Sequence, residues 1–200
     1  MYAKNTWEKY KDQLNEVFDY NEGYKHYISK NKTERACVKD SIKLAEEKGF
    51  KPLESFDTLK SGDKVYVTNR EKNIALFIIG KKPLTEGMRI LGAHIDSPRM
   101  DLKQNPLYES EGFTLADTHY YGGIKKYQWV TIPLSLYGVV CKKDGTVVDV
   151  VIGEDENDPV VGISDLLIHL SADQLDKKAA KVIEGENLDV TLGNMPLFGE

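Results

Sequence analysis

The first fifty positions carry apolar residues at helical spacing. Between Trp7 and about Tyr27 these residues recur three or four positions apart, with charged residues on the other side: Tyr10, Leu14, Val17 and Phe18. Such a stripe is typical of an amphipathic helix, since 3.6 residues complete each turn. A second stripe, formed by Val38, Ile42 and Ala45, follows the capping residue Thr33 and ends at Lys48 and Gly49. The pattern therefore predicts two helices in this part of the chain.

Three short β-prone runs follow, separated by polar or Gly/Pro-containing turns. They cover Lys64–Thr68, Asn73–Ile79 and Met88–His94. The last two are continuously apolar, which is typical of strands in a sheet covered on both faces. With helices before them to supply part of the cover, the runs predict an α/β layer.

The pattern changes to mostly β after Pro98. Trp129–Cys141 and Thr146–Ile152 are long β-prone runs joined by Lys142–Gly145, a hairpin signal. A helix is predicted from Ser164 through Leu170, with a helix-prone stretch from Ala172 to about Ile183. The change in period predicts a domain boundary near residue 100, which gives domains 1–100 and 101–200.

Composition excludes several function classes. A net charge of -5, with lysines alternating with acids, gives no basic surface for DNA or RNA. The start of the chain lacks the apolar core of a signal peptide, and no run is long enough to cross a bilayer, so we expect a soluble cytoplasmic protein. The two cysteines, Cys37 and Cys141, lie far apart and outside any CxxC spacing, and we expect both to be buried, reduced thiols.

The strongest chemical signal lies where the third apolar run ends. His94 and Asp96 stand two residues apart, just before Ser97-Pro98. Because side chains alternate along a strand, both project to one side, and the carboxylate can hold one imidazole nitrogen while the other stays free for a metal. Spacing alone gives even weight to a metal site and to a hydrogen-bonded structural pair, because a zinc site usually needs three protein ligands.

Several short motifs follow one another along the chain: Gly92–Pro98, Tyr121-Gly122-Gly123, Trp129, Leu134–Val140 and Ile168–Leu170. Together they resemble the M18 family of metalloaminopeptidases, the aspartyl aminopeptidase group. Gly92–Pro98 resembles the first metal-binding segment of the family. Tyr121-Gly122-Gly123, Trp129 and Leu134–Val140 resemble its Tyr-Gly-Gly, Trp and Leu-Ser-Leu-x-Gly-x-Val signature, in the same order. Ile168–Leu170 resembles its Ile-His-Leu segment. The specificity lies in the combination, which spans most of the chain after about residue 60.

The resemblance implies a fold and a site. The fold is α/β: part of a mixed-sheet zinc-peptidase catalytic domain with helices on the sheet over residues 1–100, followed by a β-rich insert (oligomerisation) domain over residues 101–200. His94 would ligate one of two metal ions, Asp96 would orient its imidazole, and His169 would be an active-site histidine that contacts substrate or metal. From spacing alone, His169 is more often a partly buried helix residue.

The resemblance also implies the reaction and its partners. A metal-activated water would remove N-terminal residues from a peptide substrate, with zinc as the expected metal and cobalt or manganese as substitutes. The family implies a homo-oligomer and a preference for acidic residues. Arg99 and Lys103, near the expected site, could attract an acidic side chain, but a basic residue near a motif is usually only a solvated charge.

The family's later ligands, which are further carboxylates and a C-terminal histidine, have no match before Glu200. We therefore expect an N-terminal portion of a longer enzyme, with a short inactive relative as the other reading. A non-catalytic oligomerisation or binding module is the alternative function.

Overall fold

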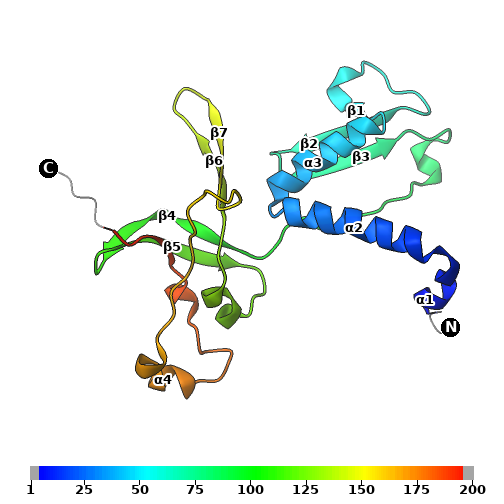
Figure 1. Ribbon diagram of the computed structural model, residues 1–200. Coiled ribbons are helices and arrows are strands. Elements are labelled where there is room, and N and C mark those ends of the chain that lie inside the picture. Colours follow the sequence, from blue (N-terminus) through cyan, green and yellow to red (C-terminus); the bar gives the residue numbers. More distant parts are fainter. Residues whose placement is uncertain (1–4, 196–200) are drawn as a thin grey trace. The chain divides into compact units, whose positions relative to one another are not determined.

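The computed structural model describes residues 5–195, which form two compact units that divide between Ser97 and Pro98 (Figure 1). The division falls near the boundary that the change in hydrophobic period predicts. Part of the opening segment that carried the signal-peptide argument, residues 1–4, lies outside the described residues. In the described residues, no helix combines the length and apolar character that a membrane span requires.

The first unit places helices beside a small sheet. Its elements are α1 (Thr6–Lys9), α2 (Leu14–Lys30), α3 (Glu34–Glu47), β1 (Lys51–Pro52), β2 (Lys64–Asn69) and β3 (Asn73–Ile78). The sheet order is β1-β2-β3, with β1 parallel and β3 antiparallel to β2. α3 packs against β2 and β3 (Figure 1), and a small core forms from Cys37, Val38, Ala45, Val65 and Tyr66. The α/β class predicted from the sequence is confirmed.

Both predicted helices form, with one interruption. The first divides because Tyr10 leaves the helical region, with ψ of 19°, and a 3-10 turn over Lys11–Gln13 connects α1 to α2. The second begins as predicted: the Thr33 side chain accepts a hydrogen bond from the Ala36 amide at 3.3 Å. It ends at Glu47, and Gly49, just after the end, has a φ of +83° that suits a residue without a Cβ.

The predicted strand over Met88–His94 is wrong. This run has no regular secondary structure, and Leu91 is fully exposed, with 101% relative accessibility. A strand needs a neighbour to pair its backbone groups, and no strand of the described residues lies beside this run. The sheet was expected to be covered on both faces. In the described residues it is not, because Leu76, Phe77 and Ile78 of β3 are exposed.

The second unit is mostly β. Its elements are β4 (Arg99–Ser110), β5 (Phe113–Tyr121), β6 (Leu136–Cys141), β7 (Val147–Ile152), α4 (Ala172–Leu175) and β8 (Val190–Gly193). An antiparallel sheet has the order β4-β5-β8, and β6 and β7 form a separate hairpin. The core lies against β5 and β8 and consists of Ala116, Val130, Val161, Ile163, Ile183, Leu188 and Val190.

Pattern-based predictions succeed only in part in this unit. The hairpin joined by Lys142–Gly145 is confirmed, with the Lys142 amide donating to the Thr146 carbonyl at 2.8 Å. The run from Trp129 begins in a 3-10 turn rather than a strand, and its strand starts at Leu136. The predicted helix over Ser164–Leu170 is wrong, since only a 3-10 turn forms at Ile168–Leu170, and the helix-prone stretch after it shortens to α4.

The cysteine prediction is half correct. Cys37 and Cys141 are both free, as expected. Cys37 is buried in the first unit, whereas Cys141 is exposed at the end of β6, so the expectation that it is buried is wrong. A two-stranded hairpin has too little surface to bury the side chains on both of its faces.

Candidate functional site

His94 and Asp96 lie together on an exposed loop of the first unit. The His94 side chain is 85% exposed and that of Asp96 is 38% exposed. The imidazole Nδ1 lies 3.0 Å from the Asp96 backbone carbonyl oxygen and 3.3 Å from Asp96 Oδ1. The two side chains thus come together, although the strand that was expected to align them does not form.

This contact determines which imidazole nitrogen can bind a metal. A carbonyl oxygen only accepts hydrogen bonds, so Nδ1 carries the proton that is donated to Asp96. In neutral imidazole the lone pair is then on Nε2, and it is this form of histidine that ligates metals. The geometry is therefore compatible with a metal ligand whose orientation the following aspartate sets.

A hollow of about 370 Å³ lies beside the pair. Its walls come from three parts of the first unit: Glu34 at the start of α3, Lys72–Ile74 at the start of β3, and Ala93–Asp96. The Cys37 thiol, one turn into α3, lies 3.8 Å from the Ile95 carbonyl oxygen and contacts the segment from below the surface. Burial raises the pKa of this thiol, so it stays protonated and acts as a donor near neutral pH.

His169 lies in the second unit, on the 3-10 turn Ile168–Leu170. The imidazole is exposed, and so are the neighbouring apolar side chains of Leu166, Leu167, Ile168 and Leu170. The reading of His169 as a partly buried helix histidine is therefore wrong. This turn instead presents a histidine within an apolar, solvent-facing segment.

The described residues contain no group of three or more His, Cys, Asp or Glu side chains arranged to hold a metal ion. His94 and Asp96 form a pair without a third ligand in this part of the chain. His94 fits the chemistry of a metal ligand, but a catalytic zinc site commonly has three protein ligands. A metal site at His94 would need further ligands from residues other than those described.

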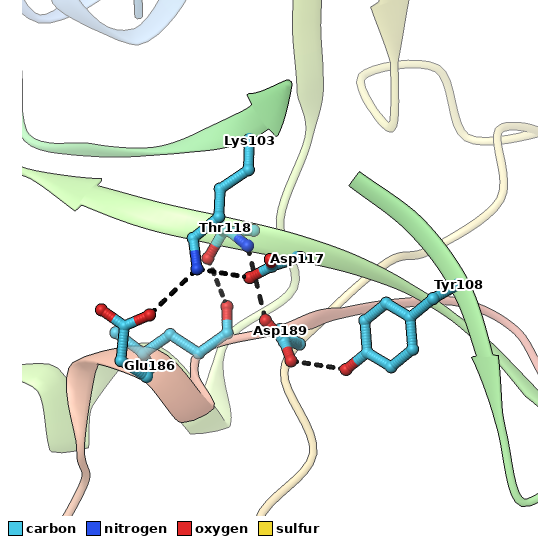
Figure 2. Close-up of polar contacts among 7 residues, drawn as sticks. Lys103, Tyr108, Asp117, Thr118, Glu186 and Asp189 are labelled. Atoms are coloured by element: carbon cyan, nitrogen blue, oxygen red, sulfur yellow. Dashed lines mark hydrogen bonds and ion pairs between the residues drawn. The ribbon is translucent and has the colours of Figure 1, made fainter. Parts of the chain in front are cut away.

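The second unit contains a separate polar network that the sequence did not predict. Figure 2 shows the Lys103 ammonium between two carboxylates, 2.9 Å from Asp117 Oδ1 and 2.9 Å from Glu186 Oε2. Both carboxylates raise the pKa of Lys103 above its usual range, and the hydrogen bond to Asp117 has the larger effect. Lys103 is 83 positions from Glu186, and no local pattern signals a contact over that separation.

The same network includes a tyrosine and a buried threonine. The Tyr108 hydroxyl donates to Asp189 Oδ2 at 2.5 Å (Figure 2), which raises the pKa of Tyr108 to about 12. The Thr118 hydroxyl donates to the Leu188 carbonyl at 2.6 Å. These bonds attach the segment Glu186–Asp189 to β4 and β5, and they indicate a structural role.

Solved proteins share this architecture. The crystal structure of an M18 family aminopeptidase from Thermotoga maritima matches with a TM-score of 0.90 and 44% identity over 100% of this chain and 43% of that chain. The crystal structure of aminopeptidase I from Clostridium acetobutylicum matches with a TM-score of 0.82 and 56% identity, over 98% of this chain and 43% of that chain. The fold is therefore that of the corresponding part of these two solved proteins, both of which are named as aminopeptidases.

The family follows from the sequence comparisons. The model of the family described as aminopeptidase I zinc metalloprotease (M18) matches residues 27–195. A probable M18 family aminopeptidase 1 from Clostridium acetobutylicum is 58% identical over 199 residues, which is 97% of this chain and 43% of that protein. The chain belongs to the M18 family, as its motifs suggest, and it spans less than half the length of these relatives.

Proposed function

We propose that this chain supplies the first metal ligand of a metal-dependent aminopeptidase that removes N-terminal residues from peptides. The observation that carries the proposal is the His94–Asp96 contact, which leaves Nε2 of an exposed imidazole available beside a hollow. Family membership supplies the class of reaction. The length of the relatives is consistent with further ligands in residues beyond the first 43%.

Each residue has a defined part in the proposed chemistry. His94 would hold a divalent metal, with zinc as the expected ion and two metals in the complete site, through Nε2. Asp96 would fix the tautomer and the ring orientation through its backbone carbonyl and carboxylate. When bound, the metals would supply an activated water and polarise the peptide carbonyl. Cys37 and the start of α3 would support the segment from inside the unit.

His169 would act at an active site from the insert unit. Its support is the resemblance of Ile168–Leu170 to the family segment, together with its exposure on an apolar turn. We propose contact with substrate or metal, in a homo-oligomer located in the cytoplasm. Exposure of the neighbouring leucines is compatible with burial of the turn against another surface.

Preference for acidic N-terminal residues rests on the resemblance alone. Arg99 and Lys103 do not support it, because carboxylates already neutralise both charges. Arg99 Nε is 2.7 Å from Asp101 Oδ1, and Lys103 contacts Asp117 and Glu186. If the preference exists, its determinants lie elsewhere in the complete enzyme.

A chimera tests the proposal. The matching residues of the Clostridium acetobutylicum aminopeptidase are replaced by this chain, and hydrolysis of aminoacyl substrates is measured with and without a chelator. We expect chelator-sensitive activity, its near-complete loss in His94→Ala, and a decrease of about 10- to 100-fold in Asp96→Asn. His26→Ala, at an exposed histidine of α2, serves as the matched control and should retain activity.

The alternative function is a non-catalytic oligomerisation or binding module, which the lack of a three-ligand group in the described residues favours. The same chimera separates the two functions. An active chimera that is indifferent to the chelator and to His94→Ala would overturn the catalytic proposal. A metal-free stable oligomer of the 200-residue chain, together with an inactive chimera, would support the module.

A further inference from the structure

Three side chains of α2 and α3 form a connected polar network that reaches the loop of His94. The Tyr27 hydroxyl oxygen lies 3.3 Å from Ser41 Oγ, and the Tyr27 hydroxyl also hydrogen-bonds to the Cys37 thiol. Cys37 is 7% exposed, and its Sγ lies 3.5 Å from the Asn31 carbonyl oxygen and 3.8 Å from that of Ile95. We call Ser41, Tyr27 and Cys37 the thiol network.

The direction of each hydrogen bond in the thiol network follows from the two carbonyl groups at its end. A carbonyl oxygen only accepts, so the single thiol proton of Cys37 is shared between Asn31 and Ile95. Sγ is then the acceptor for the Tyr27 hydroxyl, and the Tyr27 oxygen accepts from Ser41. Every member therefore donates toward the carbonyl groups, and hydrogen bonds that are connected in this way strengthen one another by polarisation.

The two carbonyl groups differ in how firmly the fold holds them. Asn31, the C-cap of α2, is buried, and its Nδ2 lies 2.9 Å from Asp40 Oδ2, while Lys30 Nζ lies 3.1 Å from Asp40 Oδ1. The Ile95 carbonyl belongs to an exposed loop, and the run before it, Met88–His94, pairs with no strand of the described residues. The Cys37 thiol therefore connects a fixed part of the unit to a segment that the sheet does not hold.

The Ile95 carbonyl is directly bonded to the part of the backbone that orients His94. It shares a planar peptide unit with the Asp96 amide, so its contact with Cys37 restricts the rotation of that unit. Asp96 in turn places its carbonyl oxygen 3.0 Å and its Oδ1 3.3 Å from His94 Nδ1. Because the His94 side chain is 85% exposed, packing does not hold the ring. Its orientation therefore depends on the backbone that follows it.

We propose that the thiol network positions the metal ligand: Cys37 holds the Ile95–Asp96 peptide so that His94 keeps its proton on Nδ1 and presents Nε2 to a metal. Cys37 acts through the backbone and touches no reacting group, so it is a positioning residue. Its importance for metal binding rests on the proposed function. The tautomer of His94, by contrast, is a property of this chain that can be measured without metal.

The tautomer of His94 tests the positioning directly. Nitrogen NMR of the histidine-labelled 200-residue chain, at a pH where the imidazole is neutral, distinguishes a proton on Nδ1 from one on Nε2. We expect Nδ1–H in the unmodified chain and a mixture of both tautomers in Cys37→Ala, because the acceptor at Asp96 is then no longer held in place. Tyr27→Phe keeps the ring and removes only the donor to Sγ, so it should cause a smaller change in the same direction.

Zinc affinity tests the consequence for the proposed site. In the chimera with the Clostridium acetobutylicum aminopeptidase, competition with a chromogenic chelator measures the affinity for zinc. Cys37→Ala should weaken binding about tenfold, the smaller end of the effect of groups that orient a metal ligand. Cys37→Ser keeps a donor at the same position and should recover most of the affinity. Val38→Ala is the matched control, because Val38 is the next residue of α3 and is 1% exposed but contributes no donor to the loop.

Three results would overturn the proposal: an unchanged His94 tautomer in Cys37→Ala, equal losses of zinc affinity in Cys37→Ala and Val38→Ala, or a Cys37→Ser variant no better than Cys37→Ala. The second would mean a general loss of stability, and the third that the volume of the sulfur matters rather than its proton. If Cys37→Ala does not fold, an unchanged tautomer in Tyr27→Phe overturns the proposal instead. Failure of the proposed function is a separate result, full zinc binding by His94→Ala, and it leaves the tautomer test intact.

Discussion

The His94 segment makes local contacts, whereas the polar network of the second unit joins residues that are far apart in the sequence. This network consists of Lys103, Tyr108, Asp117, Thr118, Glu186, Leu188 and Asp189. His94 contacts a residue two positions away, on an exposed segment that no strand pairs. In the network, Tyr108 contacts Asp189 and Thr118 contacts Leu188 across 81 and 70 positions. The residues with the clearest chemical signal in the sequence therefore make only local contacts, whereas residues without such a signal join distant segments of the second unit.

Truncation of the second unit's core should have the largest effect on stability. Leu188 has 0% exposure, and Leu188→Ala should lower the free energy of unfolding of this unit by about 2–5 kcal/mol. Urea unfolding followed by the fluorescence of Trp129, which packs on this core, measures it in a Trp7→Phe background. Leu167→Ala is the control, because that side chain is exposed; an equal loss there would contradict the assignment of the core.

Loss of the buried hydroxyl should have the next largest effect. Thr118 is 1% exposed, and Thr118→Val keeps its shape while leaving the Leu188 carbonyl without this donor. We expect a loss of about 1–3 kcal/mol in the same unfolding measurement. A Thr118→Ser variant retains the hydroxyl and should lose less; the reverse order would show that packing, rather than the hydrogen bond, is decisive.

The Tyr108–Asp189 bond should make stability depend on alkaline pH. The folded-state pKa of Tyr108, about 12, lies above the usual tyrosine value of 10.0, because the neutral hydroxyl donates to Asp189. Its contribution is therefore present below the unfolded pKa and is lost as the pH rises from about 10 through about 12. Absorbance titration near the tyrosinate band should show one tyrosine that ionises at a higher pH than usual, and Asp189→Asn should lower the pKa of this tyrosine. An unchanged titration would contradict the bond.

His94→Ala should have the smallest effect on stability. Its side chain is 85% exposed, so the free energy of unfolding of the first unit should change by no more than about 0.5 kcal/mol. Thermal unfolding of the 200-residue chain, monitored by helical circular dichroism, measures it. Val38→Ala, in the core of the same unit, is the contrasting variant and should be clearly destabilised; comparable losses would mean that His94 is a structural residue.

The sequence correctly predicts the features that depend on interactions between neighbouring residues. The Thr33 cap, the Gly49 stop and the Lys142–Gly145 hairpin all depend on residues within a few positions of one another. The same holds for the contact between His94 and Asp96. Their side chains meet, but the strand alternation on which that prediction rested does not form.

Long-range pairing determined what the sequence could not predict. Met88–His94 is apolar enough for a buried strand, but no strand among residues 5–195 pairs with it, and it is an exposed loop. The helix expected over Ser164–Leu170 failed because its apolar residues do not pack on a core and stay in solvent. The Lys103 and Tyr108 contacts depend on the register of β4, β5 and β8, which no motif specifies.

The most direct measurement is the metal content of the chimera with the Clostridium acetobutylicum aminopeptidase, determined by elemental analysis after gel filtration. The account predicts that the chimera retains divalent metal as the parent enzyme does, and that His94→Ala loses metal without unfolding. The His26→Ala control should retain it. If His94→Ala binds as much metal as the unmodified chimera, with the same affinity, His94 is not a ligand and the proposed site is wrong.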